Sequence, residues 1–90
     1  MSVNVELSSF FGRYTDNHLH IKVEGSTTGE CLDDLIRQFP KLKRLLFDKY
    51  GNFHHGYDLF VNGESVYPMG LKKPVKDGDK MNVVFIIQGG

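Results

Sequence analysis

Only a few residues of this 90-residue chain could take part in chemistry through their own reactive groups. They are one thiol, four imidazoles and a C-terminal diglycine: Cys31, His18, His20, His54-His55 and Gly89-Gly90. A cysteine can act as a nucleophile when a neighbouring group stabilises its thiolate, and histidines can bind a metal. A terminal glycine offers a carboxylate that another enzyme could activate. The surrounding sequence decides among these three possibilities.

Neither the cysteine nor the histidines are placed for catalysis or metal binding. Cys31 lies on the apolar stripe of a predicted helix, and no histidine is placed by the sequence to activate it. We therefore expect a buried, inert thiol. His18 and His20 would share one strand face, but a His-x-His pair without further ligands is far from a zinc motif. We expect exposed or structural histidines, and we predict no metal site and no intrinsically bound cofactor.

The terminal Gly89-Gly90 is the more informative feature. An α-carboxylate has a pKa near ~3.5, so it is ionised at neutral pH and must be activated before it can react as an electrophile. Two glycines have no side chains to block a narrow channel and accept positive φ freely. At ~3.3 Å per residue, the last four residues can span about 13 Å. The alternative interpretation is a merely frayed terminus.

The composition is that of a small globular domain with balanced charge. Hydrophobic residues make up 40% of the chain, and 11 Lys and Arg balance 11 Asp and Glu. Binding to nucleic acid or an anionic membrane usually requires an excess of cations, so we predict neither partner. A single cysteine allows no internal disulfide, and neither a leader nor an apolar run near ~20 residues is present. We expect a soluble, cytoplasmic protein with one domain, residues 1–90, and a flexible tail at 88–90.

Five segments are predicted to be strands from the alternation or density of their apolar residues: 2–7, 19–23, 57–61, 64–67 and 81–87. The first two would form a hairpin with a long loop over residues 8–17. Asn62-Gly63 is a dipeptide that favours a tight turn between the third and fourth. The segment 81–87 is almost continuously apolar, which predicts a central strand covered on both faces.

Helical spacing of apolar residues follows Gly25. Thr27 and Glu30 have the spacing of a capping box, which predicts the start of this helix, and Pro40 predicts its end. We also predict a short helical turn over residues 41–47.

This order of elements predicts an α+β fold of the β-grasp, ubiquitin-like type, a mixed sheet of four to five strands packed on one main helix. The last strand would lie between the first and third, parallel to the first. The predicted core residues are Val3, Val5, Leu19, Ile21, Leu32, Leu35, Ile36, Leu59, Val61, Met81, Val83 and Phe85. Phe60, Val84 and Ile86 would face the other side, and such an exposed apolar patch is typical of a partner interface.

Several short motifs, in this order, resemble the ubiquitin-like sulfur carriers of the MoaD/ThiS type over essentially the whole chain. They are Gly29-Glu30-Cys31-Leu32-Asp33-Asp34-Leu35, Phe39-Pro40, Phe60-Val61-Asn62-Gly63-Glu64, Gly70-Leu71, Asp77-Gly78-Asp79 and Gly89-Gly90. The family includes the small subunit of molybdopterin synthase, the thiamine sulfur carrier, cysteine-biosynthesis carriers and archaeal ubiquitin-like modifiers. The segment 70–79 is most similar to the last two groups.

The resemblance implies a carrier rather than an enzyme, although it could be the small non-catalytic subunit of a molybdopterin synthase. A ubiquitin-activating-like adenylyltransferase and sulfurtransferase, using ATP-Mg, would adenylate Gly90, and sulfur would then displace AMP to leave a thiocarboxylate. Gly89 would give the tail access to that site, and Phe60, Val84, Ile86 and Gln88 would contact partners. The acceptor would be an enzyme such as the molybdopterin synthase large subunit, thiazole synthase or a cysteine synthase.

Two other functions remain open at this point. The chain could be a protein modifier that forms isopeptide bonds through Gly90, or a non-covalent β-grasp interaction domain, because fold alone does not specify function. The terminal diglycine disfavours the second alternative. The lysines at positions 72, 73 and 76 are interpreted either as a solvated loop or as a contact with an acidic surface of the activating enzyme.

Overall fold

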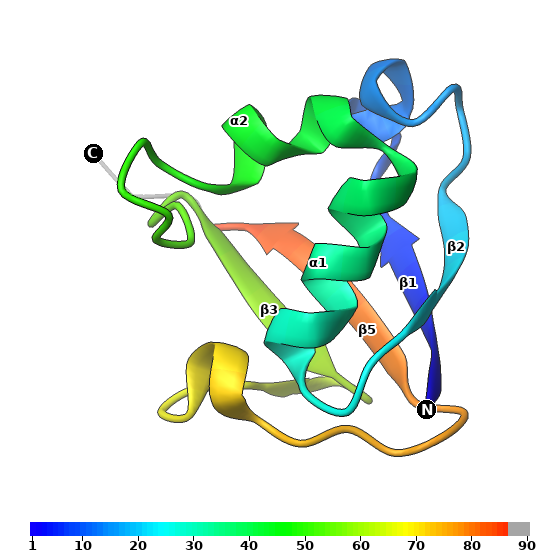
Figure 1. Cartoon of the computed structure of the whole chain (residues 1–90), viewed down its shortest axis with the longest axis vertical. Coiled ribbons are helices and arrows are strands. Elements are labelled where there is room, and N and C mark those ends of the chain that lie inside the picture. Colours follow the sequence, from blue (N-terminus) through cyan, green and yellow to red (C-terminus); the bar gives the residue numbers. More distant parts are fainter. Residues whose placement is uncertain (87–90) are drawn as a thin grey trace.

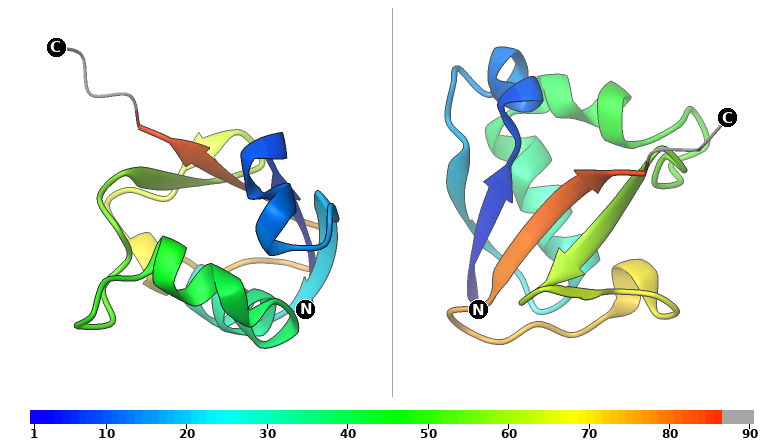
Figure 2. Two further views of the ribbon diagram at one scale, coloured as in Figure 1. Left: turned by 90° about the horizontal axis from the view of Figure 1, so that it is seen from above. Right: turned by 180° about the vertical axis from the view of Figure 1, so that it is seen from behind.

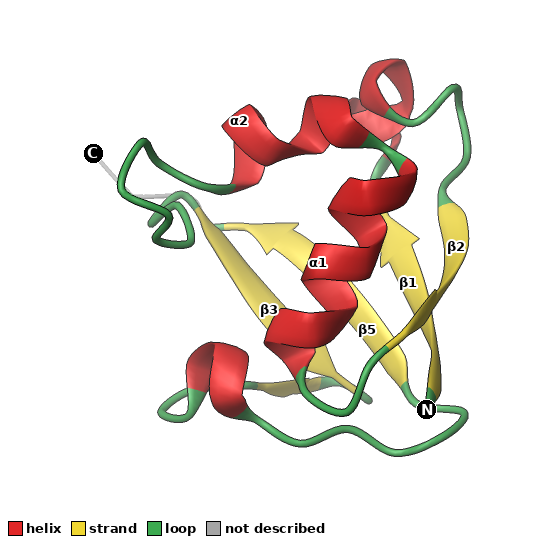
Figure 3. Ribbon diagram, viewed as in Figure 1, coloured by secondary structure: helices red, strands yellow, loops and turns green. Residues whose placement is uncertain are grey.

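The computed structural model describes residues 1–86, which form a five-stranded sheet with one main helix on one face (Figure 1). The strands are β1 (Ser2–Leu7), β2 (His20–Glu24), β3 (Tyr57–Val61), β4 (Glu64–Ser65) and β5 (Lys80–Phe85). The α-helices are α1 (Thr28–Gln38) and α2 (Lys43–Leu46), and the 3₁₀ helices are η1 (Ser9–Tyr14), η2 (Pro40–Leu42) and η3 (Gly70–Lys72). Figure 3 separates these classes by colour.

The sheet order is β2-β1-β5-β3-β4, with β5 at the centre (Figure 2). β5 pairs parallel to β1, with Val5 opposite Met81, and antiparallel to β3, with Leu59 opposite Val83. The predicted central position and direction of the last strand are therefore confirmed. The predicted cover on both faces is wrong, because Met81 and Val83 are buried on the α1 side while Asn82 and Val84 on the other face are only half-buried.

The core lies between α1 and the facing side of the sheet. Its fully buried members on the sheet include Val3, Val5 and Met81, and those on α1 include Leu32 and Leu35. Leu19 and Ile36 pack against this core but stay half-buried. Most of the predicted core is confirmed, with Phe85 as the exception described below.

α1 begins at the predicted capping residue. The side-chain oxygen of Thr27 accepts a hydrogen bond from the N–H of Glu30 at 3.2 Å. The carboxylate of Glu30 accepts one in return from the N–H of Ser26 at 2.8 Å, one residue earlier than in a standard capping box. Pro40 ends α1 as predicted and opens η2.

The two edges of the sheet differ in length, and the longer one is covered. At β2, the N–H of Glu24 donates to a carboxylate oxygen of Asp34 at 2.9 Å, and the side-chain amide of Gln38 donates to the carbonyl of Lys22 at 2.9 Å. α1 thus satisfies edge groups that could otherwise pair with another chain. The other edge, β4, has only two residues.

Three predicted boundaries change. The predicted loop 8–17 contains η1, whose Phe11 is fully buried. The strand predicted over 64–67 ends at Ser65, whose hydroxyl accepts the N–H of Tyr67 at 3.2 Å in place of a ladder partner. β5 ends at Phe85, and the predicted strand residue Ile87 lies outside the described residues. The turn at Asn62-Gly63 is confirmed by two positive φ values, 52° and 84°.

Candidate functional site

The central strand delivers the chain to one corner of the sheet. The N–H of Ile86 donates a hydrogen bond to the carbonyl of Gly56 at 2.9 Å. Ile86 is 41% exposed, so this position, which we call the tail root, lies at the surface. The predicted site residues Gln88 and Gly89-Gly90 lie outside the described residues. Their roles therefore remain predictions.

Phe60 and Val84 lie on the sheet face opposite α1, as the strand alternation predicts. Phe60 is opposite Asn82, and Asp58 is opposite Val84, so the two apolar side chains are diagonal neighbours on adjacent strands. Both are half-buried, and Ile86 continues the same alternation beyond the end of β5. We call Phe60, Val84 and Ile86 the back-face patch.

The remainder of this face is polar. The carboxylate of Glu6 lies 3.3 Å from the ammonium nitrogen of Lys80 and 3.6 Å from Nδ1 of His20, and it accepts a hydrogen bond from the amide of Asn82 at 3.2 Å. The hydrogen bonds from Asn82 and Lys80 hold the pKa of Glu6 below its ordinary value. The back-face patch is therefore confined to the β3 side of the face.

Phe85 was predicted to lie in the core under the helix, and this prediction is wrong. Its side chain is 44% exposed. It lies at the end of β5, where η1 rather than α1 covers the sheet, and its ring stacks on Phe11 at 5.6 Å and 9° and contacts Phe10 edge-on at 4.9 Å. The ring centroid of Tyr57 is 5.3 Å away. The alternation of residues along β5 correctly predicted the face of the sheet on which Phe85 lies. It did not predict that η1, rather than α1, covers this end of the strand.

Phe10 is a surface residue of this region that sequence analysis missed. It is 45% exposed and adjoins Phe85, so an exposed aromatic pair lies next to the tail root. A signal was present, because two consecutive phenylalanines in a predicted loop indicate that the loop packs against the domain.

The cysteine and histidines form no reactive site within residues 1–86. Cys31 is fully buried, and burial raises the pKa of its thiol to about 11. His20 lies beside Glu6, and Nδ1 of His54 accepts the N–H of Gly56 at 3.0 Å. No group of three or more potential metal ligands occurs among these residues, and no helix in this range is long and apolar enough to cross a membrane.

A parallel central pair, β1 and β5, flanked by the antiparallel strands β2 and β3 and covered by one helix, defines the β-grasp or ubiquitin-like fold. The ThiS family model matches residues 2–90, and the chain belongs to this family.

Solved structures agree with this assignment. CysO in its complex with BexX from Amycolatopsis orientalis is similar over 98% of this chain and 99% of that one, with 27% identity and a TM-score of 0.87. The modifier protein SAMP1 from Haloferax volcanii matches over 100% of both chains, with 22% identity and a TM-score of 0.85, and shares the fold. A chain of the complex of subunits 1 and 2 of molybdopterin-converting factor from Helicobacter pylori also shares the fold, at 21% identity, a TM-score of 0.61 and 100% coverage of both chains. No curated protein sequence matched the chain.

Proposed function

We propose that this protein is a sulfur carrier whose C-terminal Gly90 is adenylated by a ubiquitin-activating-like enzyme and then converted to a thiocarboxylate. The observation that carries the proposal is that the ThiS family match runs to residue 90, and so includes the terminal Gly89-Gly90. The Gly90 carboxylate would attack the α-phosphate of ATP and release pyrophosphate. A sulfur nucleophile would then attack the acyl carbon and release AMP.

The position of the tail root supports this role. β5 is held by both neighbouring strands, and the hydrogen bond from Ile86 to Gly56 holds the last described residue against the loop before β3. Only four residues, 87–90, follow this held strand, and the last two are glycines without side chains. Such a terminus could enter a narrow active site of a partner.

We propose further that the back-face patch, together with Gln88, contacts the activating enzyme and the sulfur acceptor. Phe60 of β3 and Val84 of β5 are diagonal neighbours on adjacent strands, and Val84 is two residues before Ile86 at the tail root. A partner holding the tail would therefore also cover them. CysO, the neighbour at 27% identity, was solved in a complex with BexX. The acceptor proposed for this chain is a biosynthetic enzyme of molybdopterin, thiazole or cysteine synthesis.

Intact-mass spectrometry after incubation with the cognate activating enzyme, ATP and a sulfur source tests the carrier function. We expect one oxygen to be replaced by sulfur, and deletion of Gly90 to abolish loading while leaving the denaturation midpoint unchanged. Gly89→Val should also block loading, because the branched side chain is wide and restricts φ. If no adenylate, thiocarboxylate or lysine conjugate forms, the carrier and modifier functions both fail.

The buried cysteine makes a second readout possible. Because Cys31 is fully buried with a pKa of about 11, iodoacetamide should not label it in the native protein. A terminal thiocarboxylate is ionised and would react with iodoacetamide, so native labelling should appear only after loading and should map to Gly90. Labelling of Cys31 in the native state would contradict the assignment of an inert thiol.

The contribution of the back-face patch is tested by Phe60→Glu, with Tyr67→Glu as the matched control. Tyr67 is an aromatic residue that is 84% exposed and lies outside the patch. Calorimetric titration with the activating enzyme should show binding about tenfold weaker for Phe60→Glu, about 1.4 kcal/mol, and little change for the control. Equal affinities of the wild type and Phe60→Glu would remove the patch from the interface.

A further inference from the structure

The segment that follows α1 carries a cluster of exposed cations. Lys41, Lys43, Arg44 and Lys49 all have exposed side chains on η2, α2 and the loop after them. The ion pairs found within residues 1–86 lie elsewhere, and none involves these four side chains. We call these four residues the α2 basic surface. Its presence in a chain of zero net charge means that positive charge is concentrated on one side.

The acidic residue within this segment offsets only part of the positive charge of the surface. Asp48 is half-buried, and its Oδ1 accepts the backbone N–H groups of Tyr50 at 2.9 Å and Asn52 at 3.0 Å. Its carboxylate is thus engaged in holding its own loop. Asp33 of α1 borders the surface near Lys43 but forms no ion pair within the described part of the chain. Four cations against these two carboxylates leave the α2 basic surface with a net positive charge.

An apolar hollow lies among the cations. It has a volume of about 640 Å³, and its walls combine the apolar side chains of Tyr14, Pro40 and Leu45 with Lys41, Lys43 and Arg44. Apolar walls beside cationic groups provide two kinds of recognition: a bulky apolar side chain can be buried while carboxylates beside it meet ammonium and guanidinium groups. A segment with alternating acidic and apolar residues has this chemistry.

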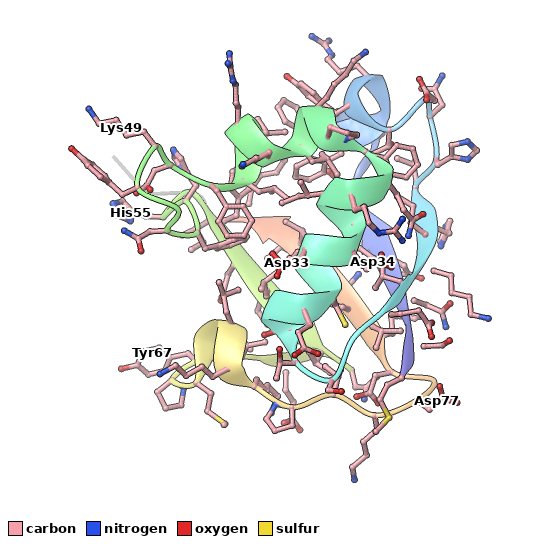
Figure 4. All side chains as sticks on the ribbon, viewed as in Figure 1. Asp33, Asp34, Lys49, His55, Tyr67 and Asp77 are labelled. Atoms are coloured by element: carbon pink, nitrogen blue, oxygen red, sulfur yellow. The ribbon has the colours of Figure 1, made fainter. Side chains whose placement is uncertain are left out.

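The α2 basic surface adjoins the tail root. A second hollow is lined by Lys43, Arg44, Lys49 and His54 together with Phe47 and Asp48, and His54 is two residues before Gly56, whose carbonyl holds Ile86. Figure 4 shows Lys49 and His55 projecting from the same loop, and Figure 1 places this loop at the start of β3, whose first residue, Tyr57, is paired with Phe85 at the end of β5. An enzyme that holds the tail would therefore lie next to these cations.

We infer that the α2 basic surface and its hollow bind an acidic segment, carrying an apolar anchor residue, of the adenylating enzyme that receives the tail. The identity of the enzyme rests on the proposed function, and the chemistry of the segment rests on the charge and shape of this surface. The surface is separate from the back-face patch, which lies on the opposite side of the sheet. Long-range attraction would bring the two proteins together, and the apolar anchor would set their orientation.

The kinetic test uses the double variant Lys43→Glu/Arg44→Glu and a matched control. The control, Lys22→Glu/Arg37→Glu, makes the same charge change at exposed cations of β2 and α1, to which no role in partner binding is assigned and where Arg37 pairs with Asp34. We expect the KM for the carrier in adenylation to rise about tenfold or more in the first variant, with kcat unchanged, and to stay within about twofold in the control. The difference should shrink at ~1 M salt, where the Debye length is about 3 Å. Equal KM values for the two variants, or a loss of kcat alone, would overturn the inference.

A peptide titration separates this inference from the proposed function. The probes are the synthetic peptide Glu-Asp-Leu-Phe-Asp-Glu and its uncharged analogue Gln-Asn-Leu-Phe-Asn-Gln, followed by amide NMR shifts of the full chain. We expect shifts for the acidic peptide in residues 40–49 and around Tyr14, lost in Lys43→Glu/Arg44→Glu. Equal binding of the analogue, shifts centred on residues 72–76, or tighter binding of a single-stranded oligonucleotide at the same residues would overturn the inference. Selective peptide binding without sulfur loading would remove only the proposed function.

Discussion

Gly25, just before α1, and Gly29, in its first turn, lie where the surrounding backbone leaves no room for a side chain. A Cβ on Gly25 would lie 2.7 Å from the backbone nitrogen of Cys31, and one on Gly29 would lie 2.9 Å from the carbonyl oxygen of Leu71. Both contacts are with backbone atoms, so no rotation of a side chain can relieve them. The first turn of α1 is also held by Thr28, whose hydroxyl donates to the carbonyl of Gly70 at 2.8 Å. Glycine is therefore required at Gly29, where the helix meets η3, and at Gly25, where the preceding chain passes the first turn of α1.

The first prediction is that Gly25→Ala destabilises the protein by about 1–3 kcal/mol, because the added methyl group forces the start of α1 away from its position. Urea denaturation followed by circular dichroism gives the measurement. Asp33→Ala, on the exposed side of the same helix, serves as the control and should stay within about 0.5 kcal/mol of the wild type. A Gly25→Ala protein as stable as the control would show that the helix start is adaptable.

The central strand β5 is packed unevenly along its length. Val83 is 2% exposed under α1, whereas Phe85 is 44% exposed and covered in part by η1. The strand therefore combines a structural part in its middle with a surface part at the tail root. The aromatic pair of Phe10 and Phe85 at that end offers a further apolar contact to a partner.

The second prediction compares substitutions at these two positions. Val83→Ala should cost about 1–3 kcal/mol, since it leaves a cavity in the buried part of the strand. Phe85→Ala should cost about 1 kcal/mol, because much of its ring is already in contact with water and its loss opens no closed cavity. Denaturation midpoints of both variants, measured together, provide the comparison. A larger loss for Phe85→Ala would mean that η1 depends on this ring for its position.

At the scale of the whole molecule, hydrogen-bonded carboxylates connect separate parts of the fold. Asp79 accepts the N–H of Lys76 and the side-chain amide of Asn62, and these bonds lower its pKa. Burial opposes ionisation of Asp34, but hydrogen bonds from the Glu24 N–H and from Arg37 outweigh it and lower that pKa as well. The pKa of Glu6 is lowered too.

The third prediction concerns pH. A carboxyl group whose pKa is lower in the folded than in the unfolded state contributes stability above the unfolded value, and this contribution is lost as the pH falls through the folded value. The ordinary values are 3.8 for Asp79 and Asp34 and 4.5 for Glu6. The free energy of unfolding should therefore be highest near neutral pH and fall below about pH 5. Urea midpoints measured between about pH 7 and pH 3 test this expectation.

Single-residue variants identify the carboxyl groups that cause this loss of stability in acid. Asp79→Asn removes one of the lowered pKa values, so its stability should decline less steeply with acid than that of the wild type. Asp33→Asn changes an exposed carboxylate that accepts no hydrogen bond within residues 1–86, and it should keep the wild-type slope. Identical slopes for all three proteins would show that these hydrogen bonds do not control acid unfolding.

The sequence by itself determined the elements, their order and the β-grasp fold, because the signals for these features are local. Alternation placed Val3 and Val5 in a strand, Thr27 and Pro40 marked the ends of α1, and Asn62-Gly63 supplied the positive φ values of a tight turn. The near-continuous apolar run of the last strand also indicated its central place in the sheet.

Only the tertiary structure decided which segments cover one another. The exposure of Phe85 and the burial of Phe11 depend on η1 folding over the end of β5. The spacing of apolar residues in the sequence does not predict this contact. The same holds for Lys43 and Lys49, ordinary surface lysines in the sequence, because the hydrogen bond between Gly56 and Ile86 brings the tail root next to the hollow that they line. Burial and electrostatic fields arise from contacts between residues far apart in the chain, so they become readable only once the chain has folded.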